Sequence, residues 1–527
     1  MSSLARAILE ECVRQDVLVD DDFVAFYVTS LATETEEVGR IVDFLADKRR
    51  PALITLKMQF YVTENPVAVE RIKQKHRDVV KQKTSRLSRE ILEGCPKSKE
   101  ERAKLLRRIV VDLVVNNSIG SPANEKVLEE TESALKSVIS ESDVTTFASL
   151  RRVDKIRTLE DLRRIVCGIR VFNSDAGHCG EGIVNLAEIV EKSLETTISL
   201  LKGSLEATKK RSHIYFSFLS SCLTTKGIKL PSSCSAELFD ILKEIGILSV
   251  QHEHFLISIH GLVVAFKFDV FQILDSFKNL LRSIHEKVKY RTAIPTDEIY
   301  PKFKDLGVLW LELQDCVHVL SEVNLMNDNL AFLADRTGSY DEIVLGMLPE
   351  SAEEDQNGDS AEKISIPCHL KDFRIVDSIP REKITYSGFC PWALSHGILL
   401  PGNESLGIIQ FQESINYSFY SRDFAETALS KMRSIEKKIS QEVASNSQLK
   451  ILLDFQSKSW KPDTEKLAKN VRIDQEMQTE LHPIPSFFDR SHSSRRRDKD
   501  MKCHSTQTLR ESCTQTIEVE DKNVQTN

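Results

Sequence analysis

The sequence predicts a mainly α-helical protein, in which an irregular helical body is followed by a small α+β module and a disordered C-terminal tail. Three observations lead to this class. Apolar residues recur at helical spacing through residues 1–345, short runs bounded by turn residues replace them in residues 365–455, and Ser, Thr and charged residues dominate residues 456–527. With 527 residues, 41% of them hydrophobic, the chain can form more than one core.

Residues 1–150 are predicted to form an N-terminal helical domain. Thr33 and Glu36 have capping-box spacing just before an apolar stripe, and a second stripe follows near residue 105. Pro122, directly after Ser121, predicts another helix start, because proline at the first helical position gives up an amide that has no partner there. The two stripes consist of Val38, Ile41, Val42 and Leu45, and of Leu105, Leu106, Ile109, Val110 and Leu113.

Residues 151–345 are predicted to form a second helical region. Its stripes need to bury their apolar faces against one another, which indicates an irregular helical assembly. No repeat of fixed period is present, and this disfavours a solenoid. The stripes consist of Leu159, Leu162, Ile165, Val166 and Ile169; of Ile183, Leu186, Val190 and Leu194; and of Phe271, Leu274, Phe277, Leu281, Ile284 and Val288.

Residues 346–364 are predicted to be an acidic, flexible linker, and residues 365–455 a small α+β module. The linker has too little apolar surface to offset the entropy of ordering. In the module, short strands are expected at residues 398–400, 407–411 and 416–420, with a turn at 401–403 and a helix over 423–443.

The charge balance limits the classes of partner. Asp plus Glu number 79 against 71 for Lys plus Arg, so the net charge of −8 argues against a general nucleic-acid binder. The eleven Cys include no CxxC pair, which is typical of reduced, intracellular thiols. The longest uncharged apolar run, residues 255–266, is too short to span a bilayer, and the charged N-terminus is unlike a signal peptide. We therefore expect a soluble protein with no nucleic-acid or membrane partner.

Residues 71–108 are an exception, because they are locally basic. A helix that carries these cations on one face would suit the acidic surface of a microtubule. The alternative interpretation is an ordinary helix face that is solvated and binds no partner. The basic residues are Arg71, Lys73, Lys75, Arg77, Lys81, Lys83, Arg86, Arg89, Lys97, Lys99, Arg102, Lys104, Arg107 and Arg108.

No catalytic residue, cofactor site or metal site can be assigned from the sequence. The Gly177–Gly182 loop lacks the Gly-Lys-Ser/Thr ending of a P-loop, so we interpret it as a turn between helices, with a nucleotide-dependent enzyme as the alternative. The His252-Glu253-His254 run and the His178–Cys179 pair contain metal-ligand types without a further ligand, and we interpret them as core or surface residues. No Ser/His/Asp or Cys/His arrangement can be nominated.

The strongest local pattern lies in the tail. None of the 13 Gln before residue 470 precedes Thr, whereas four of the five after it do. In all four sites the residue before Gln can enter an apolar pocket. The sites are Met477-Gln478-Thr479, Thr506-Gln507-Thr508, Thr514-Gln515-Thr516 and Val524-Gln525-Thr526.

These tail sites resemble the TQT-type anchor that the LC8-type dynein light chain binds as an added strand. An extended peptide can pair with a sheet edge while pockets read every second side chain. Several sites in series increase the overall affinity, since the second docking becomes intramolecular. The alternative is a Ser/Thr-rich tail with chance repeats.

Three further stretches resemble the cilia- and flagella-associated protein 206 family. The resemblance extends with gaps over residues 1–435, and residues 205–265 depart from it most. The stretches are Asn117-Ser118-Ile119-Gly120-Ser121-Pro122; Gly168-Ile169-Arg170-Val171-Phe172-Asn173 with Gly180-Glu181-Gly182-Ile183; and Tyr386-Ser387-Gly388-Phe389-Cys390 with Gly397-Ile398-Leu399-Leu400-Pro401-Gly402-Asn403 and Gly407-Ile408.

The resemblance implies a non-enzymatic protein of the ciliary axoneme. Family members help to dock a radial spoke, the second of the repeat, and an inner-arm dynein on doublet microtubules, and so support ciliary and flagellar beating. LC8-type light chain is a radial-spoke component, so the tail pattern agrees with the family. The implied location is the cytoskeleton of the cilium, with the basal body as an additional site. The alternatives are a soluble cytosolic light-chain adaptor and the nucleotide-dependent enzyme.

Overall fold

A computed structural model describes the chain in two compact units, each treated separately below. One unit comprises Met1–Tyr61, Gly203–Ile257 and Asn327–Asn527, and the other comprises Val62–Lys202 and Ser258–Met326. Helices dominate both, as predicted. The described residues are 3–15, 23–24, 28, 38–47, 50–62, 65–289, 294–348, 373–376, 379–380, 383–411, 415–445, 449 and 452–453.

The unit that begins at Val62 is helical in its described part. Ser98 caps its second helix in a capping box, because Ser98 Oγ accepts from the amide of Glu101 and the Glu101 carboxylate accepts from the amide of Ser98. Apolar side chains of its N-terminal helices form a core, which runs from Ile91 to Ile169. The helices that contribute to it are α5 (Asn65–Glu93), α6 (Lys99–Asn117), α7 (Glu125–Lys136), α8 (Glu141–Ser149) and α9 (Arg152–Asp175).

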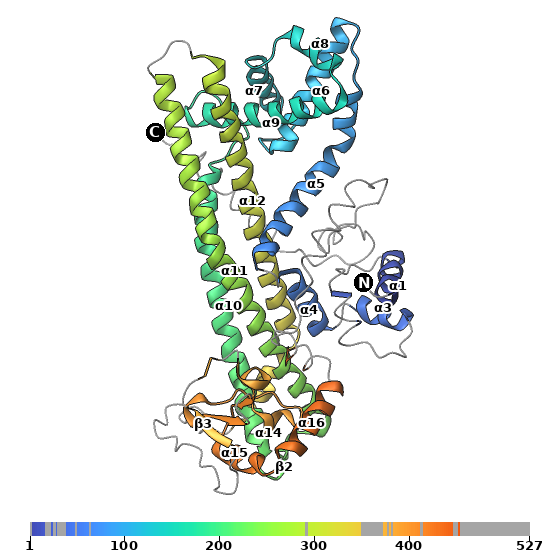
Figure 1. The fold of residues 1–527 in the computed structure, drawn as a ribbon, viewed down its shortest axis with the longest axis vertical. Coiled ribbons are helices and arrows are strands. Elements are labelled where there is room, and N and C mark those ends of the chain that lie inside the picture. Colours follow the sequence, from blue (N-terminus) through green and yellow to red (C-terminus); the bar gives the residue numbers. More distant parts are fainter. Residues whose placement is uncertain are drawn as a thin grey trace. The chain divides into compact units, whose positions relative to one another are not determined.

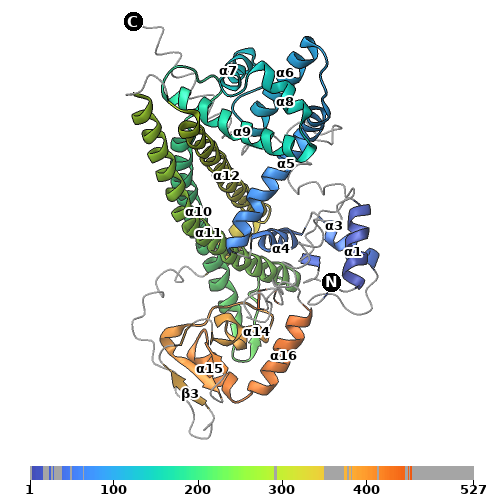
Figure 2. The same cartoon turned by 45° about the horizontal axis from the view of Figure 1, so that its top comes forward.

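Three longer helices each contribute one part to this unit and the other part to the second. They are α10 (Leu186–Cys222), α11 (Ala236–Lys289) and α12 (Thr296–Asp335). In this unit their segments run side by side, and α6, α7, α8 and α9 gather around one another (Figures 1 and 2).

The other unit contains the N-terminal helices and the α+β module. The helices α1 (Ser3–Arg14), α3 (Val38–Ala46) and α4 (Pro51–Val62) surround a small apolar core that includes Ile8, Ile41 and Leu56. After α10 the chain forms a hairpin of β1 (Leu223–Thr224) and β2 (Gly227–Ile228), and α13 (Ser339–Met347) follows α12.

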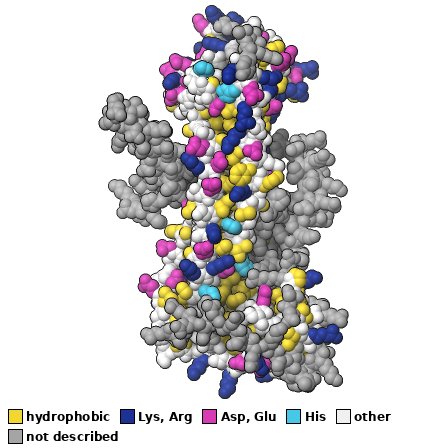
Figure 3. Space-filling view, turned by 90° about the vertical axis from the view of Figure 1, so that its left-hand side faces the viewer, with side chains coloured by type: hydrophobic (Ala, Val, Ile, Leu, Met, Phe, Trp, Pro, Cys, Tyr) yellow, Lys and Arg dark blue, Asp and Glu magenta, His cyan; other side chains and the backbone are white. Residues whose placement is uncertain are grey.

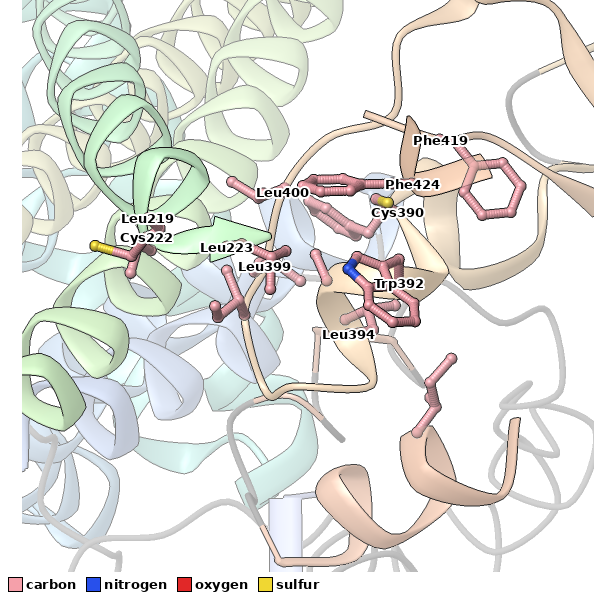
Figure 4. Packing of buried hydrophobic residues seen from close by; sticks show 14 of the residues in the cluster. Leu219, Cys222, Leu223, Cys390, Trp392, Leu394, Leu399, Leu400, Phe419 and Phe424 are labelled. Carbon is pink, nitrogen blue, oxygen red and sulfur yellow. The ribbon is translucent and has the colours of Figure 1, made fainter. Parts of the chain in front are cut away.

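The α+β module has an antiparallel sheet in the order β3-β4-β5, with Ile375 opposite Ile409 and Ile409 opposite Tyr417. Its core is continuous with the end of α10: Leu219 and Leu223 belong to the same apolar cluster as Leu399 (Figure 4). The module comprises β3 (Phe373–Val376), η3 (Thr385–Gly388), α14 (Pro391–Leu394), η4 (Glu404–Leu406), β4 (Ile408–Phe411), β5 (Ile415–Tyr417), α15 (Arg422–Leu429) and α16 (Met432–Ser445).

The structure corrects three local predictions and adds one strand. The helix expected at Pro122 begins at Glu125, with Asn124 as its N-cap, because the Asn124 side chain accepts from the Lys126 amide. Residues 398–400 do not form a strand: the carbonyl oxygen of Leu400 accepts from the Cys390 amide, and an isolated bridge pairs the following residue, Pro401, with Phe389. The helix expected over 423–443 is two helices, α15 and α16, and β3 was not predicted. The Thr33–Glu36 pair lies outside the described residues.

α11 is longer and more apolar than the uncharged run of residues 255–266 suggested. Within the part of the chain that the structure describes, it is the one helix that is long and apolar enough to cross a membrane, with a mean hydropathy of 1.6 in an 18-residue window of which 33% is buried. The uncharged apolar run covers only residues 255–266 in the sequence, whereas the helix extends well beyond it and places apolar side chains on both its buried and its exposed faces. Exposed examples are Val264 and Phe268.

Candidate functional site

All twelve residues of the predicted light-chain motifs, from Met477 to Thr526, lie outside the described residues, as does most of the acidic linker. The structure does place the three stretches that carry the family resemblance, the Gly177–Gly182 loop, the basic stretch and the candidate metal-ligand histidines. The first two stretches meet in one place, and the third folds separately in the α+β module.

Gly168 and Gly307 allow the backbones of α9 and α12 to touch. A Cβ atom built on Gly168 would overlap the carbonyl oxygen of Phe303, and one built on Gly307 would overlap the carbonyl oxygen of Arg164. Both positions are therefore restricted to glycine by the neighbouring helix. The close approach of two helix backbones explains why a glycine stands in the middle of each apolar stripe, where it would otherwise weaken the helix.

A second close approach joins the first two stretches. Gly120 and Gly182 have positive φ angles of 111° and 77°, and a Cβ on Gly182 would lie 2.6 Å from the Cα of Gly120. The turn that carries Gly120 starts where Ser118 ends α6 in the left-handed conformation. Asn117, just before it, donates through Nδ2 to the carbonyl oxygen of Arg163 over 2.8 Å. This packing holds the α6–α7 turn against the α9–α10 loop.

Arg170 fastens this junction from inside. Its side chain is 1% exposed, and Nη1 donates to the carbonyl oxygen of Val127 over 3.0 Å and to Thr131 Oγ1 over 2.6 Å. Nη2 donates to the carbonyl oxygen of Glu181 over 2.7 Å and lies 3.0 Å from Glu130 Oε2. Burial lowers the pKa of Arg170 and the Glu130 carboxylate opposes that shift, so the guanidinium stays charged. The ion pair is thus enclosed and hydrogen-bonded on several sides.

The Gly177–Gly182 loop is fixed by its own amides. The amides of Gly177 and His178 donate to the carbonyl oxygens of Ser174 and Asn173, and that of Glu181 donates to Glu130 Oε2 over 3.1 Å. A phosphate-binding loop needs such amides free to face the ligand. The geometry is that of a structural turn, and it does not favour the nucleotide-dependent alternative.

The third stretch shapes the α+β module. Tyr386 and Ser387 have φ angles of 55° and 58°, so the chain turns sharply through left-handed conformations before Cys390. The amide of Cys390 then donates to the carbonyl oxygen of Leu400, and a Cβ on Gly402 would overlap Ser418 Oγ. The residues of this stretch therefore direct the backbone and fill the core.

An open cavity of about 440 Å³ lies beside the module, where the end of α10 and the β1 hairpin face the start of α15. Hydroxyl groups line much of it, and the Tyr420 hydroxyl donates to Ser220 Oγ over 3.2 Å. A single carboxylate, Asp423, also lines it. The cavity holds none of the predicted site residues.

The basic stretch forms the α5–α6 hairpin, and ten of its fourteen basic side chains are exposed. Arg86 and Arg108 share Glu90 as an ion-pair partner. Six exposed cations form no ion pair with a described residue: Lys81, Lys83, Arg89, Lys97, Lys99 and Lys104. On the side of the molecule shown in Figure 3, by contrast, Lys and Arg side chains lie among Asp, Glu and hydrophobic side chains. The hairpin therefore has unneutralised charge available for an acidic partner.

The candidate metal-ligand histidines lie on a helix, α11, and not on a strand. His252 is 2% exposed and its Nε2 lies 3.0 Å from Thr55 Oγ1, while the His254 ring stacks on Phe389. Burial lowers the pKa of His252 to about 3, so it is neutral at physiological pH. Across the described residues, no three His, Cys, Asp or Glu side chains come together as metal ligands.

Sequence reasoning missed the structural role of Arg170 and of Gly307. A signal for Arg170 was present, because a charged residue interrupts an otherwise apolar run from Ile169 to Phe172. No comparable signal marks Gly307, since its restriction comes from Arg164 on another helix.

A family model named FAP206, described as a domain of unknown function, matches residues 189–458, about half of the chain. The match covers α10 to α16 and includes the third resemblance stretch.

Curated relatives extend the similarity to nearly the whole chain. Cilia- and flagella-associated protein 206 of Mus musculus is 27% identical over 99% of this chain and 89% of the relative, and that of Homo sapiens is 26% identical over 98% and 88%. The protein of the same name from Tetrahymena thermophila is 22% identical over 54% of this chain and 45% of the relative. No solved structure is significantly similar to this chain.

Proposed function

The chain belongs to the FAP206 family of cilia- and flagella-associated proteins, and from that premise we propose that it is a non-enzymatic structural adaptor of the ciliary axoneme. Similarity over nearly the full length of the vertebrate relatives carries this proposal. The glycines and the buried arginine of the resemblance hold backbone against backbone, which suits a scaffold and supplies no chemistry of its own.

The proposed task is to help dock the second radial spoke of the repeat and an inner-arm dynein on doublet microtubules. The test is electron tomography of axonemes from cells that lack the protein. The proposal expects the second spoke to be missing or displaced while the other spokes remain. Complete spokes at every position would contradict it.

The α5–α6 hairpin is the proposed contact with the microtubule. Its six unpaired cations would meet an acidic surface, and attraction of this kind weakens as salt screens the charges. Charge reversal at Lys81, Lys83 and Arg89 is expected to lower co-sedimentation of the purified protein with microtubules. Charge reversal at Lys202, Lys209 and Lys210, which are exposed on α10, makes the same change in net charge and should leave co-sedimentation unchanged.

The tail is the proposed site for the LC8-type light chain. Gln478, Gln507, Gln515 and Gln525 are the glutamines followed by Thr, whereas Gln475 is followed by Glu and gives a control within the same segment. Replacing Gln507 and Gln515 with Ala is expected to weaken light-chain binding to the full chain, measured by calorimetry. The Gln475→Ala variant should bind as the unaltered protein does. Equal affinity of all three proteins would exclude these motifs.

The tail pattern also supports a second candidate, a soluble cytosolic adaptor that binds the light chain without entering the axoneme. Both candidates predict the same light-chain affinities in calorimetry, so the location of the protein in the cell has to distinguish them. The axonemal proposal requires the protein to stay with doublet microtubules once the ciliary membrane is removed.

A further inference from the structure

The two edges of the β3-β4-β5 sheet differ in how they are covered. At the β5 edge, Asn416 donates through Nδ2 to the carbonyl oxygen of Lys383, and its amide donates to Thr385 Oγ1. At the other edge, β3 pairs with β4, and among the residues that the structure describes nothing pairs with its outer side. Alternate residues of such an edge strand direct their amides and carbonyl oxygens away from the sheet, where a further strand can pair with them.

A row of apolar side chains crosses the inner face of the sheet and ends uncovered at β3. Tyr417, Ile409 and Ile375 stand opposite one another on the three strands. Tyr417 is 1% and Ile409 is 0% exposed in the core of the module, whereas Ile375 is 37% exposed. An apolar side chain on a further strand would continue the row and cover Ile375.

The outer face of the sheet is polar at the same edge. Arg374 is exposed and stands opposite Gln410, whose side chain donates to Asn416 on β5. Within the described part of the chain, no carboxylate pairs with Arg374. A strand that fits this edge therefore alternates apolar residues with an acidic one, because successive side chains point to opposite faces. The adjacent charged residues Lys371, Asp372 and Asp377 lie outside the described residues.

The C-terminal tail contains such an alternation. After the last described residue, Val and Ile stand two positions apart in two places, Val471-Arg472-Ile473 and Ile517-Glu518-Val519. Only the second place has an acidic residue between its apolar pair. The β-branched residues Thr514 and Thr516 precede it and favour an extended chain. The second place is thus the one that fits an edge with an exposed isoleucine and an unpaired arginine.

The tail starts from the same unit that holds β3. Leu449 and Leu452 are buried in the apolar core against which Phe373 also packs. Residues 454–516 then connect this core to Ile517. Each residue of a chain can add up to about 3.3 Å, whereas a module of roughly 100 residues has a radius of gyration of about 13 Å. The connection is therefore long enough, and a tethered strand docks at a high effective concentration.

We propose that residues 517–520 of the tail add a fourth strand to the free edge of β3. Ile517 and Val519 lie beside Ile375 and Phe373 on the inner face. Glu518, between them, then lies opposite Arg374 in a parallel and in an antiparallel strand alike. The docked strand directly follows residues 514–516, so docking restricts the access of a light chain to that motif. This last consequence rests on the proposed function of the tail, whereas the docking does not.

The test is hydrogen–deuterium exchange of the full-length protein, measured at residues 373–376 and 514–520. In the unaltered protein, both segments should exchange about tenfold or more slowly than in the variant with Ile517→Asp and Val519→Asp, because carboxylates cannot enter the apolar row. The variant with Val471→Asp and Ile473→Asp is the matched control. It makes the same change at the other place in the tail and should leave exchange in both segments unaltered.

A charge exchange tests the pairing across the edge. Arg374→Glu should accelerate exchange in both segments, and the addition of Glu518→Arg should restore their protection. Protection should not depend on protein concentration, because the tail docks on its own chain. Fast exchange at residues 514–520 in the unaltered protein would overturn the proposal, as would a lack of restoration by Glu518→Arg.

Two further outcomes would assign the edge to another occupant and so also overturn the proposal. One is protection of residues 373–376 that persists in the variant with Ile517→Asp and Val519→Asp, which would point to a different segment of the chain. The other is protection that rises with protein concentration, which would point to the tail of a second copy. No light chain enters these measurements, so they are independent of the light-chain proposal.

Discussion

In the C-terminal half of α9, Gly168 and Arg170 are enclosed by another helix and by two loops, whereas in the N-terminal half Arg152, Val153 and Arg157 face solvent. The enclosed half carries part of the family resemblance, and the exposed half carries none of it. One helix thus contains residues that other parts of the unit restrict and, near its start, side chains that they leave exposed.

The difference separates what the family resemblance shows from what it leaves open. Residues such as Gly168 and Gly182 are restricted by the backbone that approaches them, so they indicate a shared fold. The surfaces available for partners, including the cations of the α5–α6 hairpin, consist of exposed residues that the fold does not restrict. Binding partners therefore have to be argued from charge and exposure.

The largest expected effect comes from filling the contact between α9 and α12. Gly168→Ala would place a methyl group where the carbonyl oxygen of Phe303 lies, and so force the helices apart. We expect a loss of about 2–4 kcal/mol in the free energy of unfolding, measured from urea denaturation. Gly261→Ala is the matched control, because nothing lies within 4 Å of a Cβ at that helical position. It should stabilise the protein by up to about 1 kcal/mol. Equal effects of the two replacements would contradict the close approach.

Removal of the buried guanidinium should have a comparable but smaller effect. Arg170→Met keeps much of the volume but leaves the carbonyl oxygen of Glu181 without its donor and the Glu130 carboxylate without its ion-pair partner. A loss of about 2–3 kcal/mol is expected, seen as a lower urea midpoint. Lys192→Met breaks an exposed pair with Glu188 and should change stability by less than about 0.5 kcal/mol. If Arg170→Met were as mild as this control, the enclosed ion pair would not stabilise the fold.

Enclosed and exposed groups should also differ in how they respond to pH. Burial lowers the pKa of His252 to about 3 and that of His318, which stacks on His76, to about 4, both below the ordinary value of 6.5. Between pH 6.5 and these lowered pKa values, the unfolded chain binds protons that the folded chain does not. The contribution of the two neutral histidines to stability is therefore complete above pH 6.5 and is lost as the pH falls toward their pKa values in the folded protein. Each histidine contributes a slope of up to about 1.4 kcal/mol per pH unit.

Urea midpoints measured from pH 7 down to about pH 5 test this slope, because most carboxylates remain ionised there. His252→Gln should flatten the dependence, because it removes a group that only the unfolded chain protonates in this range. An unchanged slope in His252→Gln would show that this histidine is accessible to protons in the folded protein.

The smallest expected effect lies in the exposed half of α9. Arg152→Glu with Arg157→Glu should change the free energy of unfolding by no more than about 0.5 kcal/mol, since neither side chain pairs with a described residue. Thermal melts of the purified variant should overlay those of the unaltered protein. A large drop in melting temperature would mean that these arginines belong to the enclosed half after all.

Much of the helical architecture could be predicted from apolar spacing alone. The stripe from Ile41 to Leu45 and that from Leu105 to Leu113 form α3 and α6, and their apolar side chains are largely buried as expected. The family could be identified because its glycines occupy positions where backbones meet. The change of pattern near residue 365 correctly indicated an α+β module.

The rest depended on contacts between distant parts of the chain. The residue that restricts Gly307 is Arg164, and spacing within α12 carries no sign of it. The helix begins after Asn124, whose side chain accepts the Lys126 amide, whereas the Ser121 hydroxyl before Pro122 accepts the Ala123 amide and starts only a turn. Residues 398–400 resemble a strand in composition, but their backbone pairs mainly with the loop at Cys390.

The central claim, that this protein is an axonemal adaptor, is tested most directly by stripping motile cilia of membrane with detergent and washing them with rising salt. A tagged copy of the full chain should stay with the axoneme after detergent and leave only as salt screens the charges that hold it. Release with the detergent-soluble fraction would contradict the claim and would favour the cytosolic light-chain adaptor.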